Sequence, residues 1–317
     1  MLNHKSEAEN DSLSIVVPVY NSQDSLYPLV ERLLSVATTL AKKFEILLIN
    51  DGSRDQSWET ITKLIETYPY VRGINLMRNY GQHNALLCGI RAAKYELILT
   101  IDDDLQHPPE EIPTLIQHLN QGYDVVYGTP REEQHGFWRD LASLTTKLAL
   151  QSTMGAETSR KVSAFRVFRT QLRDAFANYR SSYISIDVLL TWGTTRFGAI
   201  PVQHQPRQIG TSNYTFRKLV THALNMITGF STLPLQIASI IGFIFVLFGL
   251  CLLLYVLGYY FIKGGSVPGF PFLASVIVIF SGVQLFILGI IGEYLARMHF
   301  RMMDRPAFTI REQNEHK

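Results

Sequence analysis

Two long runs without a charged side chain, residues 235–262 and 270–292, constrain this chain more than any other feature. A helix needs about 20 consecutive apolar residues to cross the hydrocarbon core of a bilayer, and each run exceeds that length. Large apolar residues occur on every face of a helix drawn through either run, whereas a surface helix of a soluble protein keeps one polar face. The sequence therefore predicts two transmembrane helices, at about residues 235–262 and 270–295 of the 317.

Basic residues flank this pair of apolar runs on one side. Arg217 and Lys218 precede the first run and Arg297 follows the second, while the short connection between the runs contains Lys263 as its single basic residue. Lysine and arginine accumulate in the cytoplasmic segments next to membrane spans. We therefore expect an integral protein of the bacterial plasma membrane with both termini, and the whole N-terminal part, in the cytoplasm.

The N-terminal part, residues 13–215, alternates short apolar runs with amphipathic segments. This alternation is typical of an α/β domain in which helices cover both faces of a doubly wound, mostly parallel sheet. We expect strands at residues 13–19, 44–50, 71–76, 97–101 and 124–128, and helices at 25–40, 56–67, 83–93 and 110–121.

The remaining segments are expected to be accessory. Residues 216–232 have apolar residues at helical spacing, which predicts an amphipathic helix lying along the membrane, although a helix packed on the domain fits nearly as well. Residues 1–12 are expected to be mobile. Residues 298–317 are expected to form a cytoplasmic tail that is mobile beyond Ile310.

Uncommon polar residues follow each of the first four predicted strands. In parallel sheets ligands bind outside the carboxyl ends of the strands, so these residues are expected to line one site. Tyr20 offers a ring for stacking, and Asp51 suits a hydrogen bond from a base or a ribose. The segments are Pro18–Tyr20–Asn21, Asn50–Asp51–Gly52–Ser53, residues 78–83, and Asp102–Asp103–Asp104.

The aspartate run predicts a metal site. Asp102 and Asp104 are two residues apart, and on an extended segment they would point to the same side, with Gln106 extending the row. Carboxylate and amide oxygens suit Mg²⁺ or Mn²⁺, and the cation could be shared with a bound diphosphate. A merely solvated acidic turn is the alternative for an isolated Asp-x-Asp, and the polar ends of the other strands argue against it.

The chain resembles the family 2 glycosyltransferases of GT-A fold, and more narrowly their polyprenyl-phosphate branch. That branch includes dolichyl-phosphate mannose synthases, bactoprenol glucosyltransferases and the aminoarabinose transferases, whose type the 78–83 run resembles most. The resemblance covers nearly the whole chain. It rests on residues 14–21, Asn50–Ser53, Arg78–His83, Asp102–Glu110 and Gly292–Arg297.

This resemblance implies an inverting transfer of one hexosyl or pentosyl group from a nucleotide-sugar donor to a polyprenyl phosphate, for modification of cell-envelope glycans. It implies UDP rather than GDP, a Mg²⁺ or Mn²⁺ ion held by Asp102, Asp104 and Gln106, and no nucleic-acid partner. A homo-oligomer and contacts with membrane lipids are compatible with it. The implied nucleotide-binding residues are Pro18, Tyr20, Asn21, Asp51, Asp102 and Asp103.

An anionic acceptor needs cationic groups, and the guanidinium fork of arginine matches phosphate oxygens. The resemblance favours Arg131, Arg139 and Arg207, with Ser212 nearby, as the groups that bind the lipid phosphate. Arg166 is a further candidate, with a solvated surface charge as the alternative.

Some roles stay open on the sequence alone. Asp187 is a candidate catalytic residue, as a base or a sugar-orienting group, with a buried structural carboxylate as the alternative. Ser22 stands where several relatives have an acidic residue that contacts the nucleotide. A processive polysaccharide synthase and a non-catalytic membrane-anchored sensor of nucleotide or metal are the rival functions. The identity of the sugar cannot be read from the sequence.

Overall fold

The computed structural model describes residues 12–130, 162–180, 184–203, 233–264 and 269–316. The chain divides into two compact units. One contains Met1–Leu219 together with Asp304–Lys317, and the other contains Val220–Met303. Of the segment 1–12 expected to be mobile, Ser12 begins the first strand, while residues 1–11 and the expected interfacial helix at residues 216–232 lie outside the described residues.

The first unit is built on one eight-stranded mixed sheet of order β7-β5-β6-β4-β1-β2-β3-β8. Strands β3, β2, β1 and β4 are parallel; β6 lies antiparallel between β4 and β5, and β8 is antiparallel at the β3 edge. The bounds are β1 (Ser12–Val19), β2 (Lys43–Asn50), β3 (Val71–Leu76), β4 (Leu97–Thr100), β5 (Val125–Pro130), β6 (Arg166–Arg169), β7 (Phe197–Val202) and β8 (Ile310–Glu315).

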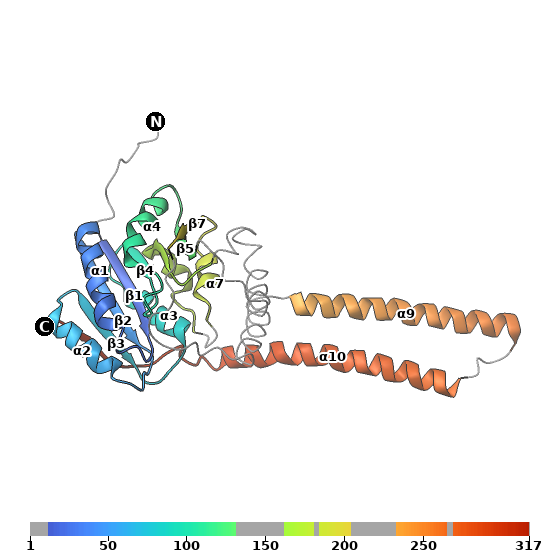
Figure 1. The fold of residues 1–317 in the computed structure, drawn as a ribbon. Helices are drawn as coiled ribbons and strands as arrows, with labels where there is room; N and C mark the ends of the chain where they lie inside the picture. The colour runs from blue at the N-terminus through green and yellow to red at the C-terminus, as the bar shows by residue number, and fades with distance from the viewer. Residues whose placement is uncertain (1–11, 131–161, 181–183, 204–232, 265–268, 317) are drawn as a thin grey trace. The chain divides into compact units, whose positions relative to one another are not determined.

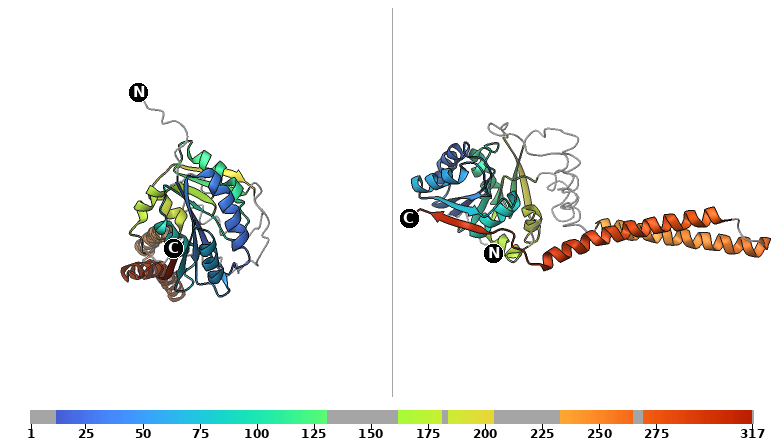
Figure 2. Two further views of the ribbon diagram at one scale, coloured as in Figure 1. Left: turned by 90° about the vertical axis from the view of Figure 1, so that its left-hand side faces the viewer. Right: turned by 90° about the horizontal axis from the view of Figure 1, so that it is seen from below.

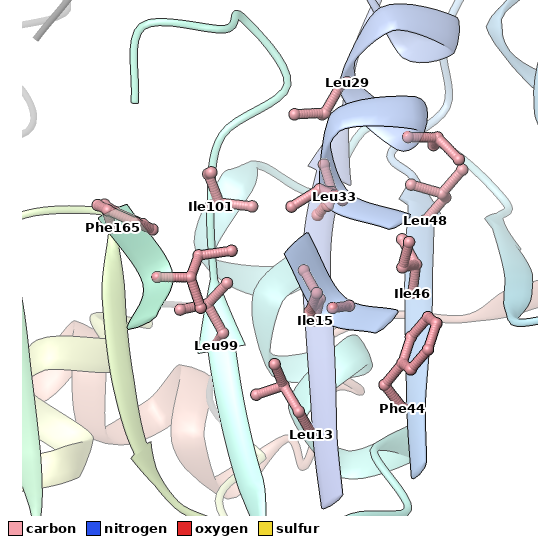
Figure 3. Close-up of a cluster of buried hydrophobic side chains, with 14 of the residues drawn as sticks. Leu13, Ile15, Leu29, Leu33, Phe44, Ile46, Leu48, Leu99, Ile101 and Phe165 are labelled. Atoms are coloured by element: carbon pink, nitrogen blue, oxygen red, sulfur yellow. The ribbon is translucent and has the colours of Figure 1, made fainter. Parts of the chain in front are cut away.

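Helices cover both faces of this sheet, as Figures 1 and 2 show. On one face the side chains of Leu13 and Ile15 from β1 lie among Leu29 and Leu33 of α1 and Leu99 of β4 (Figure 3). The core on this face also includes α2 and α4. The helices are α1 (Leu26–Leu40), α2 (Ser57–Thr67), α3 (Gln82–Ala92), α4 (Ile112–Leu119), α7 (Ile186–Thr191) and the 3₁₀ helices η1 (Pro109–Glu111) and η2 (Thr170–Phe176).

Helix α3 packs on the opposite face. Val16 follows Ile15 on β1, so its side chain points to the other face of the sheet. There it lies so close to Gly89 of α3 that a Cβ at position 89 would be 2.3 Å from the Cγ1 atom of Val16. Glycine at this position therefore permits the short distance between α3 and β1. The amino end of α3 lies at the same rim of the sheet as the carboxyl end of β4, because Gln82 donates to Asp102 just beyond β4 at 2.6 Å.

The five predicted strands and four predicted helices are all present, and their ends coincide with the expected ones or differ by at most two residues. The exception is the helix expected at residues 110–121, which is divided into η1 and α4. Pro113 has no backbone N–H and is restricted to the first turn of an α-helix, so α4 begins at Ile112 and the preceding residues form a 3₁₀ turn.

Two expectations about the sheet were wrong. The tail beyond Ile310 is not a free segment, because Ile310–Glu315 pairs with β3 in the register Asn75↔Glu312 and Arg72↔Glu315. Its polar sequence gave no strand signal, since an exposed edge strand needs no apolar face and charged residues suit that position. The strands β6 and β7 were also missed, and β6 runs antiparallel to both of its neighbours.

A buried ion pair between Arg72 of β3 and Glu45 of β2 lies at the end of the sheet opposite the candidate site, and Arg72 also contacts the exposed Glu315 of β8. Arg72 of β3 donates to Glu45 Oε2 of β2 at 2.5 Å, and its Nε lies 3.2 Å from Glu315 Oε2 of β8. Glu45 Oε1 also accepts hydrogen bonds from Ser14 Oγ at 2.7 Å and from the backbone N–H of Lys94 at 2.7 Å. The Glu45 carboxylate is thus surrounded by donors, which a buried charge requires.

The second unit consists of α9 (Leu233–Lys263) and α10 (Phe270–Met302). Within them Pro234–Ile262 and Ile279–His299 are long and apolar enough to cross a membrane, by length and composition. The helices lie side by side, since the Phe280 ring packs edge-on against Phe245 with centroids 5.6 Å apart. Near the end of α10, Glu293 forms an ion pair with Arg297 one turn later, at 2.8 Å.

Candidate functional site

The loops after β1 and β2 are joined by side-chain hydrogen bonds. The backbone N–H of Asn21 donates to Ser53 Oγ at 3.0 Å, and the Asn21 side chain accepts the backbone N–H of Arg54 at 2.8 Å. Asn21 has φ +54°, a left-handed conformation that asparagine tolerates better than most residues. The backbone N–H of Tyr20 donates to Asp103 Oδ2 at 3.1 Å, so the same loop is also attached to the turn after β4.

Asp51 holds the loop after β3. Its side chain is buried, and its two oxygens accept the backbone N–H groups of Tyr80 at 2.7 Å and of Gly81 at 2.8 Å. Burial raises the pKa of Asp51 to about 6, while these two hydrogen bonds act in the opposite sense. The sequence analysis assigned Asp51 to a nucleotide but missed this structural role, which only the pairing of two distant loops reveals.

Gly52 allows the loops after β2 and β3 to touch. It has φ +64°, and a Cβ at this position would lie 2.5 Å from the backbone carbonyl carbon of Arg78 and 2.5 Å from the backbone nitrogen of Asn79. Both the conformation and the contact exclude a side chain. Asp51 and Gly52 therefore connect the loop after β2 to the loop after β3, and they do not form an ordinary exposed turn.

The aspartate run lies in a turn. Strand β4 ends at Thr100, and Asp103 and Asp104 form a turn followed by Leu105 at φ +60°. The expectation that Asp102 and Asp104 share one side because the segment is extended is therefore wrong in its premise. A pleat places alternate residues on one face only while the strand continues.

Each of the three carboxylates is attached to a different part of the rim. Asp102 Oδ1 accepts the side-chain amide of Gln82, the first residue of α3, at 2.6 Å. Asp103 Oδ2 accepts Tyr20 N–H, and Asp104 Oδ1 accepts the backbone N–H of Gln106 at 3.1 Å. The loops after β1, β2, β3 and β4 are thus linked into one rim, as the sequence analysis expected.

Asp103 is partly buried between Tyr20 and Ser22. Burial raises the pKa of Asp103 to about 6, while hydrogen bonds from the Ser22 hydroxyl and the Tyr20 N–H lower it and the charge of Asp104 raises it further. Ser22 therefore helps to keep the pKa of Asp103 from rising further. An acidic side chain at this position would instead add a third negative charge close to Asp103 and Asp104.

The oxygen ligands at this turn fit a hard divalent cation. In the described part of the chain no three histidine, cysteine, aspartate or glutamate side chains converge as a complete protein-borne metal site. Mg²⁺ is commonly held by one or two carboxylates together with water and substrate phosphates. The protein ligands of such a site could be Asp102, Asp104 and Gln106. The phosphates of a bound ligand would supply the remaining oxygen ligands.

Asp187 lies in a buried ion pair beneath the rim. It is the second residue of α7 and pairs with Arg166 of β6, while Tyr127 of β5 donates its hydroxyl to Asp187 Oδ1 at 3.1 Å. Burial by itself would lower the pKa of Arg166, but the adjacent Asp187 carboxylate raises it above its usual value. These contacts are those of a structural carboxylate, the alternative that the sequence had left open.

Arg166 is neither a surface charge nor exposed to a lipid phosphate, because its side chain is 1% exposed. Its Nε donates to Thr100 Oγ1 at 3.0 Å, at the end of β4. His83 of α3 accepts the backbone N–H of Ile186 at 3.4 Å, so α3 is linked to the start of α7. The remaining candidates for binding the lipid phosphate lie outside the described residues: Arg131, Arg139, Arg207 and Ser212.

Comparison with known sequences gives consistent matches. The profile of glycosyl transferase family 2 matches residues 14–180. The undecaprenyl-phosphate 4-deoxy-4-formamido-L-arabinose transferase of Klebsiella pneumoniae strain 342 is 36% identical over 301 residues, covering 94% of this chain and 92% of that protein. The protein of the same name from Pectobacterium carotovorum is 33% identical over 304 residues, covering 95% and 93%.

Solved structures match part of the chain in fold. Glucosyl-3-phosphoglycerate synthase from Mycobacterium tuberculosis, in complex with Mn²⁺, UDP-glucose and glycerol 3-phosphate, has a TM-score of 0.51 at 16% identity, covering 69% of this chain and 78% of that chain. Mannosyl-3-phosphoglycerate synthase from Rubrobacter xylanophilus has a TM-score of 0.51 at 17% identity, covering 68% and 71%. These likenesses show a GT-A-like fold.

The close contact between Gly52 and the loop after β3 predicts that a methyl group at position 52 lowers stability and loosens that loop. Gly52→Ala should destabilise the protein by about 1 to 2 kcal/mol through its left-handed backbone and by about 1 to 3 kcal/mol more through overpacking. Gly122→Ala, at φ +108° with no atom near its Cβ position, is the matched control that suffers the conformational cost alone. Hydrogen exchange should show faster exchange of the Tyr80 and Gly81 amides in Gly52→Ala only. Unchanged protection there would contradict the assigned contact.

Proposed function

Since the chain belongs to glycosyl transferase family 2, we propose that it transfers one sugar from a nucleotide-sugar donor to the phosphate of a polyprenyl lipid. The observation that carries this proposal is the match to polyprenyl-phosphate sugar transferases at 36% identity over 94% of the chain, which includes the domain and both apolar helices. A match over the domain alone would have supported only a glycosyltransferase. The C-terminal helices are proposed to anchor the enzyme in the membrane where its acceptor resides.

The donor is proposed to bind at the linked rim. Tyr20 is 38% exposed and presents a ring on which a base can stack, while its backbone is held by Asp103. Pro18, Asn21 and Asp51 complete the proposed nucleotide pocket. UDP is the nucleotide to test first, because the family resemblance favours it and a fold neighbour binds UDP-glucose.

A Mg²⁺ or Mn²⁺ ion, held by Asp102, Asp104 and Gln106, would stabilise the negative charge that develops on the departing diphosphate. The acceptor phosphate is an anion at neutral pH, so its oxygen can attack the anomeric carbon without a general base. The new bond forms on the face opposite the departing nucleotide, which inverts that carbon. Asp187 is accordingly proposed to act as a positioning residue, since its carboxylate is committed to Arg166 and Tyr127.

Arg131, Arg139 and Arg207, together with Ser212, are proposed to bind the lipid phosphate. Arginine neutralises a phosphate while presenting two parallel donors, which fixes the direction of the attacking oxygen. The proposed topology places the catalytic domain and both termini in the cytoplasm, where nucleotide sugars are made. A nucleic-acid partner is not proposed.

Activity can be tested directly with purified full-length protein in detergent. With Mg²⁺ or Mn²⁺, undecaprenyl phosphate and a panel of UDP- and GDP-sugars, one donor should yield a lipid-linked sugar that mass spectrometry identifies. The product mass also identifies the sugar. A product with several sugars on one lipid would favour a processive synthase. Nucleotide binding without any product would favour a sensor and contradict the proposed transfer.

The metal ligands predict a loss of turnover without a loss of folding. Asp104→Ala should lower kcat by roughly 100- to 1000-fold, the usual effect of removing a group that stabilises developing charge. Asp124→Ala is the control, because this carboxylate precedes β5 at the opposite rim and pairs with Arg196 at 2.9 Å. The control should keep its kcat and its dependence on Mn²⁺. Full activity of Asp104→Ala would place the metal elsewhere.

The proposed phosphate site predicts a selective acceptor defect. Arg207→Ala should raise the KM for polyprenyl phosphate roughly 10- to 100-fold, because a charge-assisted hydrogen bond is lost. Arg207→Lys should recover part of this loss. Donor binding, measured by titration with UDP, should stay unchanged. A donor defect with normal acceptor kinetics would show that Arg207 serves the nucleotide instead.

A further inference from the structure

A row of side-chain hydrogen bonds crosses the rim from the edge strand β8 to the loop after β1. Glu312 Oε1 accepts Asn75 Nδ2 at 2.9 Å, and Asn75 Oδ1 accepts Asn50 Nδ2 at 2.8 Å. Asn50 Oδ1 accepts the backbone N–H of Ser53 at 3.3 Å, and Ser53 Oγ accepts the backbone N–H of Asn21 at 3.0 Å. The row therefore begins in the chain's last strand and ends in the proposed nucleotide pocket.

The sheet register makes this row continuous. Asn50 pairs with Asn75 across β2 and β3, and Asn75 pairs with Glu312 across β3 and β8. Val19 of β1 pairs with Asn50 of β2, and Asn21 follows Val19 by two residues. Asn21 therefore lies just beyond the level of Asn50 and Asn75 in the sheet. The participating groups thus come from four adjacent strands at their site-facing ends.

The carboxylate of Glu312 determines the direction of the whole row. An asparagine amide can present either its oxygen or its NH₂ group, whereas an ionised carboxylate accepts hydrogen bonds only. Glu312 therefore turns the Asn75 NH₂ toward itself, which turns the Asn75 oxygen toward Asn50. The Asn50 oxygen is then left to accept from Ser53 N–H.

Burial makes this orientation matter. Asn75 is 7% exposed and Asn50 is 2% exposed, so neither amide can readily exchange its partner for water. If both amides reversed, an NH₂ group of Asn50 would face the backbone N–H of Ser53, two donors against each other. The loop carrying Ser53 and Asn21 would then have to move.

We propose that Glu312 is a positioning residue for the donor nucleotide, acting through the fixed orientation of Asn75 and Asn50. This inference rests on the proposed function, because the loop it positions is the proposed nucleotide pocket. It makes the segment after the second apolar helix a functional part of the catalytic domain rather than a tail.

The test compares three variants of the full-length protein. Glu312→Gln keeps an acceptor oxygen but adds an NH₂ group that can face Asn75, so it should raise the donor KM less than Glu312→Ala does. Glu312→Ala removes the acceptor and should raise the donor KM and the Kd for UDP about fivefold, the usual effect of one lost hydrogen bond. Glu312→Lys imposes a donor and should raise both values further than Glu312→Ala. The kcat at saturating donor and the acceptor KM should stay unchanged.

Glu315→Ala is the matched control, because Glu315 is on the same strand but bonds Arg72 and Lys94 at the opposite end. It should lower Tm without changing donor KM. Equal donor defects in Glu312→Ala and Glu315→Ala would overturn the inference, as would UDP binding by Glu312→Lys that matches wild type. A wild-type protein that binds UDP yet transfers no sugar would overturn the proposed function alone, since the order of UDP affinities would still support Glu312.

Discussion

The proposed chemistry depends on a constraint at the ends of the parallel strands, where backbone N–H groups leave the sheet and need new acceptors. Here aspartate side chains supply several of them. Asp51 binds two N–H groups of the loop after β3, and Asp103 binds one of the loop after β1. The loops that must bind a ligand are therefore held by carboxylates rather than by neighbouring strands, which leaves their other side chains available.

The same arrangement sorts the acidic residues by role. Asp51 and Asp103 lie in surroundings that raise their pKa values, while Asp187 is paired with the guanidinium of Arg166. A proposed acceptor that is already ionised explains why no carboxylate has to be reserved as a base. The acidic groups can instead serve three needs at once: fixing loops, compensating a buried cation and binding a metal.

The sequence predicted most elements that have a regular pattern of apolar residues. Strands β1 to β5, helices α1 to α4 and the two apolar helices all show clear periodicity or length, and the polar residues at their ends correctly indicated a shared rim. It failed where stability comes from long-range partners. The polar strand β8 depends on Arg72 and Asn75, and the turn at Asp103 depends on Tyr20, so neither could be recognised from local residues. The residues expected to bind the lipid phosphate lie outside the described segments, and their roles stay predictions.

The position of β8 in the chain has a consequence for biosynthesis. Because Asp304–Lys317 belongs to the same compact unit as the first 219 residues, the two apolar helices are an insertion within one domain. A ribosome releases the last strand only after both helices have been made, so until then the edge of β3 has no partner and Arg72 lacks Glu315. Completion of the sheet therefore follows synthesis of both apolar helices, and a nascent chain interrupted before that point would expose an unpaired strand edge to aggregation.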